Sequence, residues 1–252
     1  MQFAFDFGAV AEIERMRERL VRVFGRLVPE AKPEPFSQLV RSIIGSRTRD
    51  EVSERAFASL RNRFPDWTDL AKATPGEIAE TIAAVTFAEK KADYLSRLFH
   101  SFAARNRSLD LAALASLSVE DARLWLEALP GVGTKVAAAT LNFSSLAKPA
   151  FVVDTHVLRV LQRFGIVGPR STNHRAYETV MAATGDWSST DFMEFHALVK
   201  RLGQTICTAY RPKCPVCPIR DGCRLARNSG ARLEEAVLLR GLSPDRGRRP
   251  RR

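Results

Sequence analysis

The chain has 252 residues, of which 45% are apolar, enough for one large hydrophobic core or two small ones. Its formal net charge of +11 favours a polyanionic partner, with nucleic acid first. No apolar run approaches the length of a membrane span, and residues 1–6 lack the basic start of a signal peptide, so we expect a cytoplasmic protein.

Apolar residues spaced by three and four positions recur along nearly the whole chain, which is typical of amphipathic helices. We therefore expect an all-α protein, with helices over residues 9–26, 36–46, 50–63, 76–84, 90–105, 119–128, 134–146, 155–164, 173–183 and 191–206. Pro35 suits a first helical turn, and Asp50 and Ser118 suit N-caps. Thr74 is expected to begin another helix through a capping box with Glu77.

The last residues form a basic tail. From Asn228 onward the chain carries seven arginines against three acids, so this tail contributes +4 and the preceding residues contribute +7. Its end, Arg246-Gly-Arg-Arg-Pro-Arg-Arg252, is too polar to be buried, and we expect residues 228–252 to be disordered and weakly attracted to phosphates. The body of the protein is therefore basic in its own right.

Two amphipathic segments are joined by Leu129-Pro-Gly-Val-Gly-Thr-Lys135. We expect a tight hairpin in which Gly131 and Gly133 permit positive φ and Val132 inserts into the core. Successive backbone N–H groups at the start of the next helix then bind a phosphate without reading sequence. An ordinary helix–helix turn would explain a bare Gly-x-Gly, but the longer motif is more specific.

Lys135 falls in the first turn of the helix after this hairpin, where the positive end of the helix dipole disfavours the protonated amine. Further along, Val153-Asp-Thr-His156 places Asp154 just before another expected helix, where a carboxylate is a natural N-cap. Considered alone, Lys135 is explained as well by a surface lysine that contacts a phosphate.

All four cysteines fall in the arrangement Cys207-x6-Cys214-x2-Cys217-x5-Cys223. Clustered cysteines in a cytoplasmic protein favour a metal site over disulfides, and thiolates select zinc or an iron–sulfur cluster. Only Cys214 and Cys217 have the spacing of a zinc knuckle, and the run also differs from that of ferredoxins. Spacing by itself leaves both kinds of site open.

The hairpin, the Val-Asp-Thr-His segment and the cysteine spacing follow one another as in the endonuclease III family of helix-hairpin-helix DNA glycosylases, which the chain resembles over most of residues 20–225. The resemblance implies a [4Fe-4S] cluster on the four cysteines and double-stranded DNA with damaged bases or abasic sites as partner. It also implies a six-helix domain over residues 28–147 and a cluster domain built from 1–27 and 148–227, with DNA across the cleft between them. We expect a monomer associated with the nucleoid.

In the family, the lysine after the hairpin attacks the sugar C1′ of a damaged nucleotide and the acid assists. The resemblance carries these roles to Lys135 and Asp154, and implies a bifunctional DNA glycosylase and abasic-site lyase that excises oxidised pyrimidines. A Schiff base on the lysine makes the adjacent sugar proton acidic enough for β-elimination of the 3′-phosphate.

Extrusion of the nucleotide leaves a gap that side chains must fill. Motif alignment places Arg47 where the family usually inserts a glutamine, and Phe87 where a second wedge usually enters. A core aromatic is an equal alternative for Phe87, and Thr86 replaces a family glycine. His156 is expected to support the Asp154 loop beside the DNA.

Cations of the cysteine segment offset the charge of the cluster or face DNA phosphates. Arg211 and Lys213 are the phosphate candidates.

Three other functions compete. Adenine-mismatch glycosylases lack a lysine at position 135 and carry a catalytic glutamate where this chain has Ser42, and thymine-mismatch enzymes tend to have tyrosine at the lysine position. Both comparisons disfavour a mismatch enzyme. A non-catalytic DNA-binding or redox-sensing scaffold belongs to a different class, which the departures at Arg47 and Thr86 keep open.

Overall fold

The computed structural model describes residues 7–26, 32–103 and 111–228. These residues form helices and connecting loops without a single strand, so the prediction of an all-α protein is confirmed. The predicted tail from residue 229 onward lies outside the described residues. None of the described helices is both long and apolar enough to cross a membrane.

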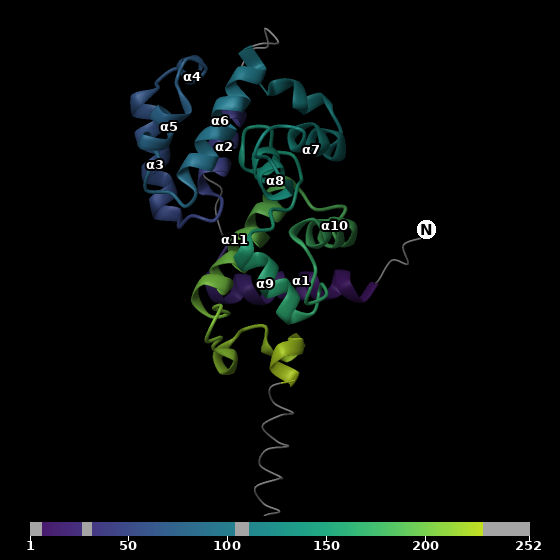
Figure 1. The fold of residues 1–252 in the computed structure, drawn as a ribbon. Coiled ribbons are helices and arrows are strands. Elements are labelled where there is room, and N and C mark those ends of the chain that lie inside the picture. Colours follow the sequence, from purple (N-terminus) through teal and green to yellow (C-terminus); the bar gives the residue numbers. More distant parts are fainter. Residues whose placement is uncertain (1–6, 27–31, 104–110, 229–252) are drawn as a thin grey trace, which may run out of the picture.

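The helices, shown in Figure 1, follow the predicted order. In chain order the elements are α1 (Phe7–Phe24), α2 (Pro35–Gly45), α3 (Asp50–Arg63), α4 (Trp67–Leu70), α5 (Pro75–Thr81), α6 (Ala88–Ala103), η1 (Ala112–Ser116), α7 (Val119–Glu127), α8 (Thr134–Phe143), α9 (Thr155–Phe164), α10 (Asn173–Ala183), α11 (Ser189–Thr205), η2 (Cys214–Val216) and η3 (Arg220–Gly222).

Most of the predicted helix starts are confirmed by hydrogen bonds. Pro35 is the first residue of α2, and the Ser118 hydroxyl accepts a bond from the Asp121 N–H at 3.0 Å. Thr74 and Glu77 form both bonds of the predicted capping box at the start of α5. The short helix α4 was not predicted, because its four residues are too few to show a period.

The prediction of Asp50 as an N-cap is wrong. Arg49 occupies the N-cap position of α3, and Asp50 is the first helical residue. The Asp50 carboxylate instead accepts bonds from Lys200 Nζ at 2.9 Å and Gln204 Nε2 at 3.2 Å, both on α11. The Asp50 carboxylate, which was predicted to cap α3, thus forms a long-range ion pair with Lys200 instead.

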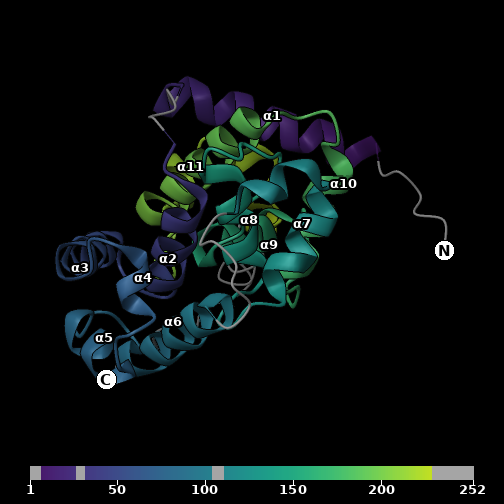
Figure 2. The same ribbon diagram turned by 90° about the horizontal axis from the view of Figure 1, so that it is seen from above.

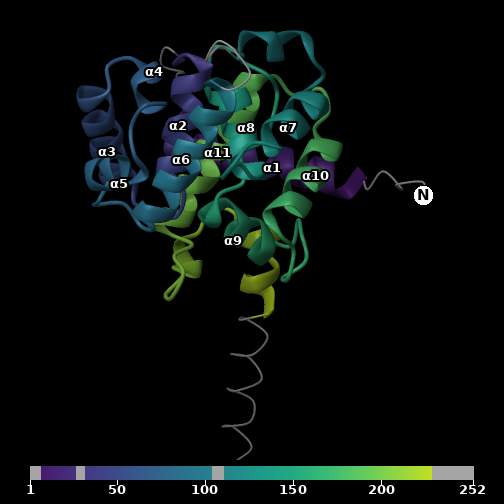
Figure 3. The same cartoon turned by 45° about the horizontal axis from the view of Figure 1, so that its top comes forward.

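Helix α8 lies at the centre of the fold and packs against α2, α7, α10 and α11. Around it, α2 to α7 gather on one side, while α1, α9, α10 and α11 pack together on the other (Figure 1). Figure 2 shows α1 running along α10 and α11 at the edge opposite α3 and α5. Figure 3 places the cysteine segment below α9. One continuous hydrophobic cluster runs through both groups of helices.

Ion pairs and rings fasten α1 to α11. Arg17 Nη2 lies 2.6 Å from Asp191 and 2.7 Å from the buried Glu194, and the guanidinium stacks 4.9 Å from the centroid of Trp187. Trp187 is itself buried, so the contact lies inside the packed core. The N-terminal helix is therefore held by residues that follow it by more than half the chain.

Candidate active site

The hairpin between α7 and α8 has the predicted shape. Gly131 has a φ of +76°, and Val132 is buried in the core while its N–H bonds the Leu129 carbonyl at 3.2 Å. The expectation of positive φ at Gly133 is wrong, because this N-cap of α8 has a φ of −112°. The two glycines therefore serve different purposes: only Gly131 needs the left-handed region.

The hairpin gives a matched pair of stability predictions. A Cβ at Gly131 would lie 2.6 Å from the Tyr94 ring, whereas a Cβ at Gly133 meets nothing within 4 Å. Strained φ and overpacking together should lower the free energy of unfolding of Gly131→Ala by about 2–4 kcal/mol. Gly133→Ala should stay within about 1 kcal/mol of wild type. Urea unfolding measures both, and equal losses would contradict this account.

Lys135 is the second residue of α8, and its side chain is half-buried. Burial lowers the pKa of its amine, and the positive charge of Lys200 lowers that pKa further. The negative charges of Asp154 and Asp50 act on the same pKa in the opposite direction. Burial is the largest effect, so the net shift favours the neutral amine.

Asp154 is the N-cap of α9, as predicted, and its Oδ1 accepts a bond from the Val157 N–H at 2.8 Å. The two residues before it are also anchored through their carbonyls. The Val153 carbonyl accepts a bond from Asn173 Nδ2 at 2.7 Å, and the Val152 carbonyl one from His196 Nδ1 at 2.7 Å. The carboxylate therefore sits at the end of a tightly fixed segment.

His196 is a core residue whose ring makes a hydrogen bond. Its ring is buried, and burial lowers the pKa of His196 to about 4. The imidazole is thus neutral at neutral pH, with its proton on Nδ1 toward the Val152 carbonyl. Its charged neighbours are Asp154, Lys200 and Lys135, which places it beside the candidate catalytic pair.

Asp50, the first residue of α3, also acts on the Lys135 amine through its negative charge. Burial by itself would raise the pKa of Asp50, but its bonds to Lys200 and Gln204 lower the pKa below its usual value. The ion pair spans from the start of α3 to the middle of α11. Helical periodicity carried no sign of Lys200, because a lysine on a helix surface is unremarkable in sequence.

The two expected wedge residues share an unusual backbone. Arg47 has a φ of 55° and Phe87 a φ of 60°, a region that costs a residue with a Cβ about 1–2 kcal/mol. Both side chains are exposed, Phe87 to 58%. Phe87 is therefore not a core aromatic, and that alternative is wrong.

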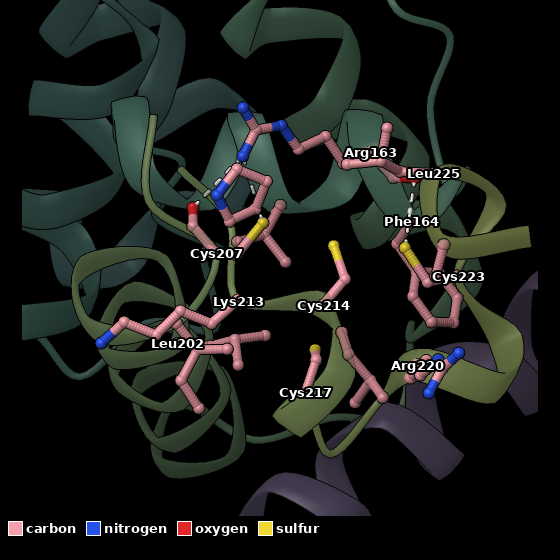
Figure 4. A pocket seen from close by; sticks show the side chains of 15 residues that line it. Arg163, Phe164, Leu202, Cys207, Lys213, Cys214, Cys217, Arg220, Cys223 and Leu225 are labelled. Atoms are coloured by element: carbon pink, nitrogen blue, oxygen red, sulfur yellow. Dashed lines mark hydrogen bonds between the residues drawn. The ribbon is translucent and has the colours of Figure 1, made fainter. Parts of the chain in front are cut away.

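The four cysteines lie around one hollow at the end of α9 and α11 (Figure 4). All four are free thiols, each partly buried. Burial, together with charge on the other three sulfurs, raises the pKa of Cys217 to about 11. No three metal-binding side chains among the described residues are placed to hold a single metal ion.

Two arginines that the sequence did not single out line this region. Arg163 Nη1 lies 3.5 Å from Cys207 Sγ and donates to the Thr208 carbonyl at 2.7 Å, while Arg159 Nε donates to the Cys207 carbonyl at 3.0 Å. They lie one turn apart on α9, and that spacing in front of a cysteine segment is the signal that could have identified them. Arg211 and Lys213 are exposed, as phosphate contacts require.

His156, expected to support the Asp154 loop, lies in the first turn of α9. Its Nδ1 is 3.2 Å from Arg159 Nη2, and its Cβ would be 3.0 Å from a Cβ placed on Gly203. His156 therefore packs directly against α11 at Gly203. The close approach explains why position 203 carries no side chain.

Comparisons with known proteins agree on the family. Residues 40–185 match the model of the HhH-GPD superfamily of base excision DNA repair proteins. Endonuclease III of Thermotoga maritima is 29% identical over 218 residues, covering 86% of this chain and 95% of that protein. An endonuclease III homolog of Encephalitozoon cuniculi is 28% identical over 230 residues, covering 86% and 92%.

The fold agrees as well. A solved structure of a trapped endonuclease III–DNA covalent intermediate superposes with a TM-score of 0.72 at 22% identity, covering 88% of this chain and 98% of that one. The family match covers more than half of the sequence and includes both the hairpin and the Asp154 segment. The chain belongs to the HhH-GPD superfamily of base excision DNA repair proteins, and it is similar to endonuclease III over nearly the whole length of these relatives.

Proposed function

We propose that the protein is a bifunctional DNA glycosylase and abasic-site lyase that removes oxidised pyrimidines, with Lys135 as nucleophile and Asp154 as its acidic partner. One arrangement carries the proposal: Lys135 lies in the first turn of α8 and Asp154 at the N-cap of α9, and the charge of Asp154 acts on an amine whose pKa burial lowers. An amine must be neutral to attack, and a neighbouring carboxylate stabilises the positive charge that develops on the sugar.

In the proposed reaction the Lys135 nitrogen bonds to C1′ while the bond from C1′ to the base breaks, and the base leaves with the electron pair. Asp154 stabilises the cationic sugar and passes the proton that the attacking nitrogen loses to the sugar O4′, whose bond to C1′ breaks when the ring opens. Ring opening gives an iminium, loss of a C2′ proton follows, and the C3′–O bond breaks by β-elimination. Because the Val157 N–H and the anchored backbone hold Asp154, its carboxylate needs no rearrangement during these steps.

The four cysteines fit the proposed [4Fe-4S] cluster. Four thiols from one short segment line one hollow, and thiolates are the ligands that hold iron–sulfur clusters, so the donor set fits the cluster that the resemblance implies. Arg163 and Arg159 provide positive charge and donors beside Cys207. The bound cluster would fix the fold of the segment, so that the exposed Arg211 and Lys213 are presented to phosphates.

The proposed division into two domains follows the packing. Residues 28–147 hold α2 to α8, and residues 1–27 with 148–227 hold α1, α9, α10, α11 and the cysteine segment. We propose that DNA crosses between them as the partner of a monomer, with the amides of Gly131 to Gly133 on a phosphate. Lys135 and Asp154 come from opposite sides of this division.

Arg47 supports a second candidate, a glycosylase with a shifted lesion or opposite-base preference. It is exposed, in a left-handed conformation, at the position where the family usually inserts a glutamine. A guanidinium donates hydrogen bonds but accepts none, so it selects a different orphaned base from a glutamine amide.

Borohydride trapping tests the proposed function. Wild-type protein is incubated with duplexes that contain an abasic site, thymine glycol or a mismatch, each opposite all four bases, and then reduced. A covalent adduct with abasic and thymine glycol DNA is expected, because reduction fixes the lysine imine. Adducts only with mismatches support the second candidate, and strand cleavage without any adduct contradicts a lysine imine.

The charges around Lys135 predict pH shifts of opposite sign. Lys200→Met removes a positive charge and leaves Gln204 as the partner of Asp50, so the pKa of Lys135 rises and the ascending limb of trapping rate against pH moves to higher pH. Asp50→Asn removes a negative charge and should move that limb to lower pH. Lys200→Arg keeps the charge and serves as control. A general loss of structure would not shift the two profiles in opposite directions.

A further inference from the structure

The loops that carry Arg47 and Phe87 are joined to each other through one hydroxyl group. Thr48 Oγ1 accepts a bond from the Thr86 N–H at 3.2 Å and from Lys91 Nζ at 2.9 Å. Thr48 follows Arg47 directly, and Thr86 precedes Phe87 directly. The bond therefore fixes the backbones of the two wedge candidates relative to each other.

Lys91 adds a second connection. Its Nζ also donates to the Ile44 carbonyl at 2.7 Å, at the end of α2, and its backbone N–H bonds the Phe87 carbonyl at 3.0 Å. The side chain is only 5% exposed, on the apolar face of α6. One residue thus holds the end of α2, the Thr48 hydroxyl and the Phe87 backbone together.

Both exposed residues keep a backbone conformation that side chains rarely adopt, and such strain persists only where the surroundings enforce it. Exposed loop tips supply no packing for that purpose. The Thr48 and Lys91 bonds are the contacts positioned to do so, because they are formed by residues next to or bonded to the strained ones.

We propose that Thr48 is a positioning residue that couples Arg47 and Phe87 into a single two-part wedge, so that both enter the duplex as a unit when a nucleotide is extruded. The proposal rests on the proposed function, because it requires the two side chains to enter lesion-bearing DNA. Lys91 completes the coupling by holding the hydroxyl from the side of α6.

Thr48→Val and Thr48→Ser form a matched pair for the test. Valine keeps the shape but cannot accept the bonds from Thr86 and Lys91, whereas serine keeps the hydroxyl. Affinity is measured by fluorescence anisotropy for a duplex with a tetrahydrofuran abasic analogue and for the same duplex undamaged. Thr48→Val should bind the analogue about tenfold more weakly and undamaged DNA equally well, because only the lesion complex requires insertion. Thr48→Ser should restore the affinity.

A double-mutant cycle then separates the coupling from the wedge itself. Arg47→Ala, Phe87→Ala and the double variant are measured in the wild-type and in the Thr48→Val background. Strong coupling that disappears with Thr48→Val supports the inference, and coupling that persists overturns it. If neither alanine variant weakens analogue binding in the wild-type background, the wedge assignment of the proposed function fails instead. Thermal unfolding of each variant identifies any that bind weakly because they are unfolded, and Lys91→Met then provides an independent break of the same connection.

Discussion

Replacing Lys135 by glutamine is expected to abolish the borohydride-trapped adduct and to lower strand cleavage at abasic sites by about 10³-fold or more. Glutamine keeps the length and polarity of the side chain but has no amine that can form an imine. Because burial opposes the charged form of Lys135 more strongly than Asp154 and Asp50 favour it, a neutral replacement should not destabilise the folded protein. Thermal unfolding of the variant should therefore match wild type or exceed it.

The Lys135→Gln experiment needs a control that separates chemistry from binding. Lys200→Gln makes the same substitution at the neighbouring lysine of the site. It should still give the adduct, with a shifted pH profile. Both variants should bind an uncleavable abasic analogue with affinities near that of wild type. An adduct that survives in Lys135→Gln would assign the nucleophile to another amine, and Lys200 is then the first residue to test.

Replacing Cys217 by alanine is expected to produce protein that lacks most of its iron and the visible absorption of the cluster. The remaining three thiols no longer complete a four-thiolate site, and the segment from Cys207 to Cys223 contains only short 3₁₀ turns to hold its shape. Limited trypsin digestion should cut this segment faster in the variant than in wild type, at its exposed Lys213 or Arg220. Affinity for undamaged duplex should fall with it.

Iron content and absorption are measured on protein purified without oxygen, next to a Thr208→Ala variant as control. Thr208 lies in the same segment, and its hydroxyl bonds the Arg211 carbonyl rather than a thiol. This variant should retain its iron. One tightly bound zinc per wild-type chain in place of iron would contradict the cluster assignment while leaving the thiolate site intact.

The sequence was sufficient for the parts of the protein that depend on local pattern. The helices from residue 155 to 183, the caps at Thr74 and Ser118, and the turn at Gly131 follow from periodicity, side-chain hydrogen bonding and backbone freedom. These effects act within a few residues, so a sequence displays them directly.

Contacts between distant residues were not predictable in the same way. Asp50 has the chemistry of an N-cap, yet its partner is Lys200, which lies 150 residues later. Lys91 lies on the apolar face of α6, and nothing near it in sequence indicates that Thr48 and Ile44 are its partners. The packing of α3, α6 and α11 decides which charged side chain meets which partner. The pattern of apolar residues in the sequence does not contain that information.

The pairing of α1 with α11 has a consequence for biosynthesis. Arg17 cannot form its ion pairs until Asp191 and Glu194 leave the ribosome, roughly 10–30 s later at ordinary rates of translation. Meanwhile α2 to α7 can already pack on one another and on α8, so α1 stays without its partners until α10 and α11 have been synthesised. Because the cysteines emerge after α11, the proposed iron–sulfur cluster would be loaded only after the helices have been synthesised. Chains from iron-starved cells are then expected to be folded everywhere except in the cysteine segment.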